Sequence, residues 1–210
     1  MRARDNPFRS ERVESLAYRA PGFDWARLLA RLAAQGGRGA IRGPQGSGKT
    51  TLLHELGERL EGAGYTVRRL RPDPDDRSLA RRQLRELTTG LGPDVALLLD
   101  GADRLGWSQW QALRRGSREA AVLVVTTHRS GRLPTLYRCS TSVELLRELV
   151  AELAPVEMLP EARGDDDWAS ALYARAGGNL RLALRELYDR AVRGIAEEPA
   201  EGRSGVAASG

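Results

Sequence analysis

The sequence predicts an α/β fold in which helices cover both faces of a parallel sheet. Short apolar segments alternate with longer amphipathic segments along most of the 210-residue chain. This is the order expected of strand–helix–strand units with right-handed crossovers. The segments 95–100 and 120–127 are almost wholly apolar, which indicates central strands that are buried on both faces of a parallel sheet.

The elements follow from periodicity and from breakers. Apolar or alternating segments predict strands at 39–42, 65–70, 95–100, 120–127 and 135–138. Apolar residues at helical spacing predict helices at 51–60, 77–91, 107–115, 142–153 and 165–176. A last helix is expected after Gly177 and Gly178, which end the preceding one, with Asn179 as its N-cap.

The composition excludes several classes of protein. Hydrophobic residues make up 41% of the chain and charged residues 29%, so neither a disordered chain nor a fibre is expected. Cys139 is the single cysteine, which excludes an intramolecular disulfide and a CxxC metal site. No apolar run approaches the roughly 18 residues that span a membrane, and the first residues lack the apolar stretch of a signal peptide. We therefore expect a soluble, cytoplasmic protein with no membrane partner.

Positive charge is concentrated near the N-terminus. The formal net charge is +5, and residues 1–42 contain nine Arg against four acidic residues, so the remainder of the chain is balanced. A basic arm favours nucleic acid or an acidic protein as a partner, whereas a solvated Arg-rich segment gives the same pattern. The partner, protein or nucleic acid, stays open at this point.

Lys49 is the only lysine among the 33 Lys and Arg residues. A chain that uses Arg everywhere else is expected to keep one ammonium for a chemical reason, because Lys fits as a compact point charge against phosphate oxygens. The residue lies in the pattern GxxxxGK[ST], between a predicted strand and a predicted helix, as a phosphate-binding loop requires. The expected nucleotide-binding residues are Gly43, Pro44, Gln45, Gly46, Ser47, Gly48, Lys49, Thr50 and Thr51.

This motif predicts a site for ATP and Mg²⁺. Its glycines let successive backbone N–H groups turn toward phosphate oxygens, and the N-terminus of the following helix adds a partial positive charge. Lys49 is expected to reach the β- and γ-phosphates, and the Thr50 hydroxyl to ligate Mg²⁺. No NKxD sequence follows, which disfavours a guanine nucleotide.

Polar residues at the ends of two predicted strands should lie beside this loop, because ligands of parallel sheets bind at the carboxyl ends of the strands. Asp100 is a candidate Mg²⁺ ligand, or it caps the next turn. Asp103 is a candidate base for an attacking water, or the N-cap of the following helix. Thr127 and His128 are candidates for contact with the γ-phosphate or that water; the alternatives are a strand-end hydroxyl and a surface histidine.

Two further features carry hypotheses. Arg181 is predicted in the first turn of the last helix, where a cation opposes the helix dipole. A residue placed against its local preference hints at function, here a contact with a bound phosphate, and an exposed arginine is the alternative. Trp107 and Trp110 are three residues apart and are expected to share a helix face, either in the core or exposed together as a partner interface.

Taken together, these motifs resemble those of AAA+ ATPases, close to the initiator, clamp-loader and STAND branches. The resemblance rests on Gly43–Thr50 as Walker A, Leu97–Asp103 as Walker B, Thr127–Arg129 as sensor 1 and Gly177–Arg181 as sensor 2. It implies a three-layer P-loop NTPase with a five-stranded parallel sheet, a helical lid, and ATP with Mg²⁺. By this analogy His128 is sensor 1 and Arg181 is sensor 2.

The resemblance also implies a division of the chain and some departures from the family pattern. Gly101 stands where many such ATPases carry a catalytic Glu, and the candidates for an arginine finger are Arg129 and Arg132. Phe8 or Arg9 is expected near the adenine. The expected parts are a basic N-terminal segment (1–22), an ATPase core (23–154), a helical lid (155–195) and a disordered tail (196–210).

Three functions are consistent with these features. The first is a Mg²⁺-dependent ATPase, converting ATP and water to ADP and phosphate, or an ATP-driven switch that acts on a protein or nucleic acid. The second is a P-loop kinase for a small molecule, with an Arg-rich lid formed by Arg77, Arg81, Arg82 and Arg85. The third is an adaptor that binds ATP without hydrolysing it, which Gly101 allows. A homo-oligomer is a further candidate assembly.

Overall fold

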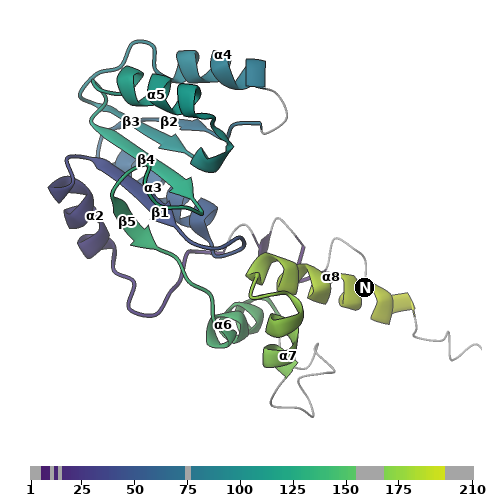
Figure 1. Cartoon of the computed structure of the whole chain (residues 1–210). Helices are drawn as coiled ribbons and strands as arrows, with labels where there is room; N and C mark the ends of the chain where they lie inside the picture. The colour runs from purple at the N-terminus through teal and green to yellow at the C-terminus, as the bar shows by residue number, and fades with distance from the viewer. Residues whose placement is uncertain (1–5, 10–11, 14–15, 74–76, 155–167, 197–210) are drawn as a thin grey trace, which may run out of the picture.

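The computed structural model describes residues 6–9, 12–13, 16–73, 77–154 and 168–196 (Figure 1). One sheet of five strands forms its centre, and all strand pairs are parallel. The strands are β1 (Arg38–Arg42), β2 (Thr66–Leu70), β3 (Val95–Leu99), β4 (Val122–Thr127) and β5 (Thr135–Arg138). The predicted α/β class, the parallel sheet and its five strands are therefore confirmed.

The strand order in the sheet is β2-β3-β4-β1-β5. Strand β4 therefore lies between β1, which precedes the glycine-rich loop, and β3, which precedes Asp100. Every residue of β3 and β4 is buried, as their continuous apolar sequences predict. This order brings the ends of β1, β4 and β3 side by side at one edge of the sheet.

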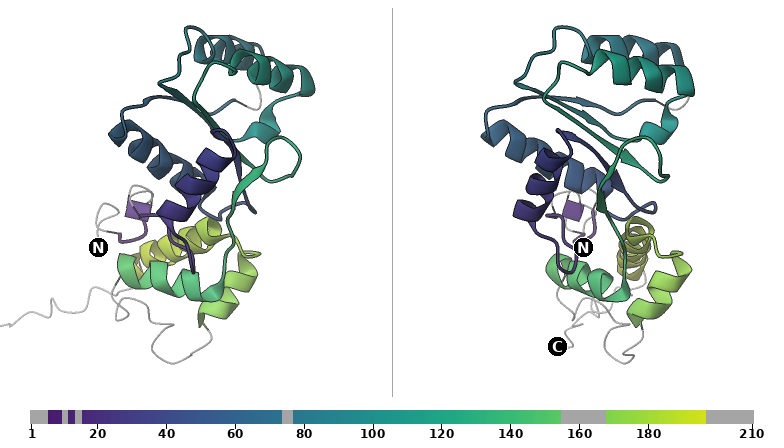
Figure 2. Two further views of the ribbon diagram at one scale, coloured as in Figure 1. Left: turned by 90° about the vertical axis from the view of Figure 1, so that its left-hand side faces the viewer. Right: turned by 60° about the vertical axis from the view of Figure 1, so that its left-hand side comes forward.

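Helices cover the two faces of the sheet (Figure 2). On one face, α2 (Trp25–Ala34) and α3 (Lys49–Gly62) pack against alternate strand residues such as Ala96 and Leu98. On the other face, α4 (Arg77–Leu87) and α5 (Trp107–Gly116) pack against residues such as Leu97. Because strand side chains alternate between faces, each helix layer is buried against its own set of sheet residues.

Helix α2 was not expected from the sequence, although its start and its apolar face both have clear signals. The side chain of Asp24 accepts a hydrogen bond from Ala26 N–H at 2.8 Å, which caps the helix. Leu28 and Leu32, four residues apart, are buried against the sheet. The basic N-terminal fifth of the chain therefore contributes a complete helix to the core layer.

Helix α4 ends earlier than predicted. The sequence predicted a helix to residue 91, but it stops at Leu87. The Thr88 hydroxyl donates to Leu84 O at 2.9 Å, and the Thr89 hydroxyl donates to Arg85 O at 2.7 Å. Threonine side chains that bond to nearby carbonyls compete with helix continuation, so consecutive threonines explain the early end.

The prediction for the two tryptophans was wrong. Trp110, on the buried side of α5, is 5% exposed and packs in the core between α5 and the sheet, whereas Trp107 is 77% exposed. Residues three apart on a helix differ by about 60° around its axis, and here the boundary of the buried face falls between them. The pair is neither a core unit nor a two-tryptophan surface.

A helical unit follows the sheet, and it lies beside the carboxyl ends of the strands (Figure 1). It comprises α6 (Val143–Leu153), α7 (Trp168–Arg175) and α8 (Leu180–Ala196), whose apolar faces form one buried cluster. Gly177 and Gly178 separate α7 from α8, as predicted, and adopt positive φ values of 59° and 75°. Helix α6 thus packs with α7 and α8.

Several predicted segments lie outside the described residues. These are much of the linker before α7, the first residues of the helix predicted at 165–176, and the predicted tail beyond Ala196. In the part of the chain that is described, no helix is long and apolar enough to cross a membrane. Within the N-terminal segment, Phe8 is buried in the cluster of α6, α7 and α8, and Tyr18 is buried against the α2–α3 face.

We predict that burial decides the effect of leucine truncation on α8. Leu187 is 3% exposed and Leu182 is 50% exposed on the same helix. Leu187→Ala should lower the free energy of unfolding by about 2–5 kcal/mol, because it removes buried apolar surface and leaves a cavity. Leu182→Ala should change it by less than about 0.5 kcal/mol. Urea unfolding followed by far-ultraviolet circular dichroism measures both, and equal effects would contradict the packing of α8 described above.

Candidate functional site

A cleft of about 710 Å³ lies between the carboxyl edge of the sheet and the helical unit. Its lining includes residues of the Gly43–Thr50 loop, Asp100, Asp103, His128 and Arg181. Ligands of parallel sheets bind at this edge. Predicted site residues from four separate segments are therefore brought together in one place.

The loop between β1 and α3 requires glycine at two positions with left-handed backbone. Gly46 has φ +74° and Gly48, the N-cap of α3, has φ +78°. A Cβ on Gly46 would lie 1.8 Å from Asn179 Oδ1, and a Cβ on Gly48 would lie 3.1 Å from the Tyr18 ring. Both the backbone conformation and the close neighbours therefore exclude side chains here.

Lys49 is buried at the start of α3, with only 9% of its surface exposed. Its ammonium donates hydrogen bonds to Gly43 O at 2.9 Å and Pro44 O at 2.6 Å. Burial is the main cause that lowers its pKa, since it penalises the charged form, while Cys139, Asp100 and Asp103 oppose the shift. The ammonium is thus held by neutral carbonyls, and an anion in the cleft would stabilise its charge.

Asp100 follows β3 and is tied to two threonines. Its Oδ1 accepts from the Thr126 hydroxyl at 2.6 Å, and its Oδ2 accepts from the Thr50 hydroxyl at 3.1 Å. The hydroxyl–carboxylate pair of Thr50 and Asp100 presents hard oxygen donors, which suit Mg²⁺, and this cation usually keeps several waters besides one or two protein ligands. No group of three or more His, Cys, Asp or Glu able to hold a metal occurs in the described part of the chain.

Asp103 connects η2, a short 3₁₀ helix (Ala102–Arg104), to the end of β4. Its Oδ1 accepts from the Thr127 hydroxyl at 2.7 Å, and its Oδ2 accepts from His128 N–H at 2.5 Å. The N-cap of α5 is Gly106, so the interpretation of Asp103 as that N-cap is wrong. Both carboxylate oxygens are engaged, and the residue orients the end of β4 at the cleft.

His128 faces the glycine-rich loop. Its Nδ1 lies 3.0 Å from Gly43 O and 3.5 Å from Lys49 Nζ. Thr127 is buried, with 1% exposure, and its hydroxyl also accepts from Arg129 N–H at 3.1 Å. Of these two residues, His128 is therefore the one that lines the cleft. The buried Thr127 hydroxyl instead ties the end of β4 to Asp103.

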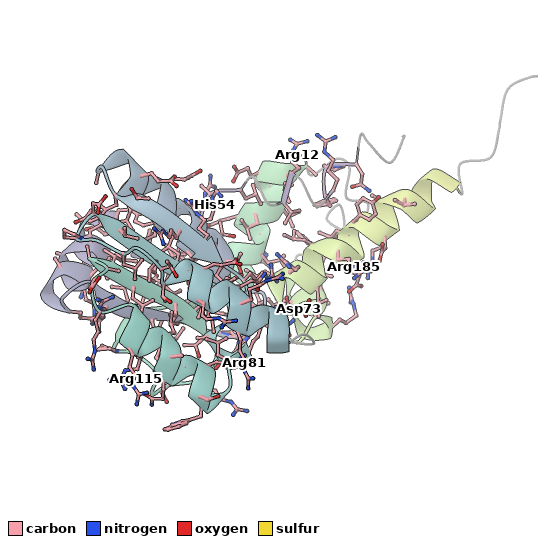
Figure 3. The ribbon with its side chains drawn as sticks, turned by 90° about the horizontal axis from the view of Figure 1, so that it is seen from above. Arg12, His54, Asp73, Arg81, Arg115 and Arg185 are labelled. Atoms are coloured by element: carbon pink, nitrogen blue, oxygen red, sulfur yellow. The ribbon has the colours of Figure 1, made fainter. Side chains whose placement is uncertain are left out.

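The helical unit contributes the N-terminus of α8 to the cleft. Asn179 Oδ1 accepts from Leu182 N–H at 3.2 Å, which confirms the predicted N-cap. Arg181 is exposed in the first turn and lines the cleft. Arg185, one turn further along α8 (Figure 3), lines it as well, although no feature of the sequence pointed to it. Phe8 and Arg9 also line the cleft, and their expected position near an adenine stays a prediction.

Some candidate residues lie elsewhere. Arg129 is exposed and is not among the residues that line the cleft. Arg132 donates to Leu105 O at 2.6 Å and lies 5.0 Å from the Trp110 ring centre, so this finger candidate is engaged within its own chain.

Two arginines that the sequence analysis did not select line the cleft near Asp100. They are Arg71, immediately after β2, and Arg104 in η2. Arg71 Nε lies 3.7 Å from Asp100 Oδ2. The available signal was the position of Arg71 at a strand end, but its proximity to Asp100 depends on β2 and β3 being neighbours.

No family model matches the chain, and a comparison with curated proteins finds no significant match. The function must therefore be argued from the geometry of this cleft.

The burial of Lys49 gives a pH prediction that is unusually simple to test. Because this is the only lysine, lysine labelled with ¹³C at Cε yields a single side-chain signal. We expect its midpoint to be lower in the folded protein than in concentrated urea. The folded state then binds fewer protons between the two pKa values, so the free energy of unfolding should rise with pH in that window. Identical midpoints would contradict the desolvation of this ammonium.

Proposed function

We propose that this chain binds ATP with Mg²⁺ and acts as an ATPase or ATP-driven switch of the AAA+ type. The observation that carries the proposal is the buried Lys49 ammonium on a glycine-rich loop, beside the Thr50–Asp100 pair. A lone lysine in an Arg-rich chain, placed at a helix N-terminus between backbone N–H groups, suits phosphate oxygens.

Each residue has a distinct role in the proposal. Lys49 binds the β- and γ-phosphates, and the amides of Gly46 to Thr51 surround them. Thr50 and Asp100 hold Mg²⁺, which would neutralise charge on the phosphates. His128 contacts the terminal phosphate from the end of β4, and Arg181 approaches from α8. Asp103, with Thr127, positions His128.

The adaptor alternative has one observation in its favour. Gly101 provides no carboxylate next to Asp100, and both oxygens of Asp103 accept hydrogen bonds from β4 and the residue after it. A general base must reach the proton that it abstracts, so tight binding with slow turnover is consistent with this arrangement. The kinase alternative finds less support, since Arg81, Arg82 and Arg85, which are described members of its expected lid, do not line the cleft.

The proposal predicts that nucleotide binding depends on Lys49. Lys49→Ala should weaken Mg²⁺–ATP binding by about 10- to 100-fold, because it removes a charge-assisted contact to phosphate. Arg115→Ala is a matched control, since it removes one exposed positive charge on α5, outside the cleft. Isothermal titration calorimetry measures both affinities. Failure of the unmodified protein to bind ATP would refute the proposed function.

Turnover then separates the alternatives. ATP hydrolysis without an acceptor, measured over a range of protein concentrations with Lys49→Ala as the blank, should exceed the blank if the chain is an ATPase. Specific activity that rises with concentration would indicate a site completed between subunits of a homo-oligomer. Binding without turnover would favour the adaptor.

A further inference from the structure

Arg71 and Arg104 come from neighbouring segments and meet at the Asp100 side of the cleft. Arg71 follows β2, and Arg104 belongs to η2, which follows β3. Arg104 Nη1 donates to Pro72 O at 3.0 Å, which holds η2 against the segment after β2. In the sheet, β2 lies on the opposite side of β3 from β4 and β1. Arg71 and Arg104 therefore face the glycine-rich loop across Asp100.

Gly101 explains how Arg104 reaches this position. Its φ of +94° is a left-handed conformation that L side chains rarely adopt. A Cβ on Gly101 would lie 3.1 Å from Arg104 Nε and 3.2 Å from Arg104 Cδ. The Arg104 side chain therefore lies over Gly101, and a side chain on residue 101 would crowd it.

The two arginines differ in how they are paired. Arg71 Nε is 3.7 Å from Asp100 Oδ2, the oxygen that also accepts from Thr50. Arg104 has its carbonyl partner, but within the described residues no carboxylate pairs with it. A cation bound at Asp100 would compete with Arg71 for the shared oxygen, which would free its guanidinium for an anion.

The charge balance of the cleft favours an anion of several charges. Its described lining contains six arginines and Lys49 against three aspartates. Guanidinium groups bind phosphate oxygens in bidentate fashion. A surplus of four positive charges on one cleft matches a polyphosphate better than a single carboxylate ligand.

We propose that Arg71 and Arg104 form a subsite for the terminal phosphate of a nucleoside triphosphate, supplied by the same chain that carries Lys49. This inference rests on the proposed function, since it requires a nucleotide whose β-phosphate is held by the loop. The subsite recognises the triphosphate over the diphosphate. It also supplies in cis the positive charge that a partner's arginine finger would otherwise bring.

The test compares binding of a triphosphate and a diphosphate by the full chain. The probes are the non-hydrolysable β,γ-imido analogue of ATP and ADP, each with Mg²⁺, in calorimetric titrations. Arg71→Ala and Arg104→Ala should each weaken the analogue about tenfold and leave ADP within about twofold. Arg69→Ala is the matched control, because Arg69 lies on β2, pairs with Glu61 at 2.6 Å and does not line the cleft. It should change neither affinity.

The remaining outcomes separate this inference from the function on which it rests. If the unmodified protein binds both probes, and each variant binds both probes as tightly as the unmodified protein does, the subsite is refuted while the nucleotide site stands. An equal loss for both probes would also refute it, because it indicates a structural role. Absence of binding to either probe by the unmodified protein would overturn the nucleotide site itself. Arg71→Lys, which keeps the charge but not the fork, should retain part of the preference.

Discussion

Three glycines allow three distant segments of the chain to approach one loop. A Cβ on Gly43 would lie 2.6 Å from Cys139 O, one on Gly46 would overlap Asn179, and one on Gly48 would touch Tyr18. The neighbours come from the exit of β5, the start of α8 and the N-terminal segment. The loop is therefore the place where sheet, helical unit and N-terminus meet, and the shape of the cleft depends on its lack of side chains.

This close packing explains why the Lys49 ammonium is desolvated while it remains next to open cleft. The loop curls around the side chain, so that Gly43 O and Pro44 O become its hydrogen-bond partners. Neutral carbonyls only partly offset the loss of water around an ammonium. An anionic ligand in the cleft would therefore stabilise the charged form of Lys49. The close approach of Gly46 to Asn179 also links any movement of the loop to α8.

The sequence was sufficient for the five strands, for most of the helices and for the position of the glycine-rich loop. It was insufficient for α2, for the end of α4 and for contacts between distant segments. Strand positions followed from local apolar patterns, whereas the insertion of β4 between β3 and β1 is a tertiary result. The role of Asp103 was ambiguous because a local rule favours a helix cap, while Thr127 and His128, 24 and 25 residues away, take both its oxygens. The place of Arg71 in the site could not be predicted for the same reason, since its proximity to Asp100 requires the pairing of β2 with β3.

The two aspartates after β3 illustrate how the site can be rigid at one end and adjustable at the other. Thr126 and Thr127, consecutive on β4, each donate to one of them, Asp100 and Asp103. These buried ties fix η2 against β4 and leave little freedom for Gly101 between them. In contrast, the partners of Asp100 Oδ2 among the described residues are Thr50 and Arg71, and the Arg71 side chain is half exposed. Ligand-dependent change is therefore expected on the side of Asp100 that faces Arg71, because there a long ion pair with a half-exposed arginine can be exchanged for a phosphate contact.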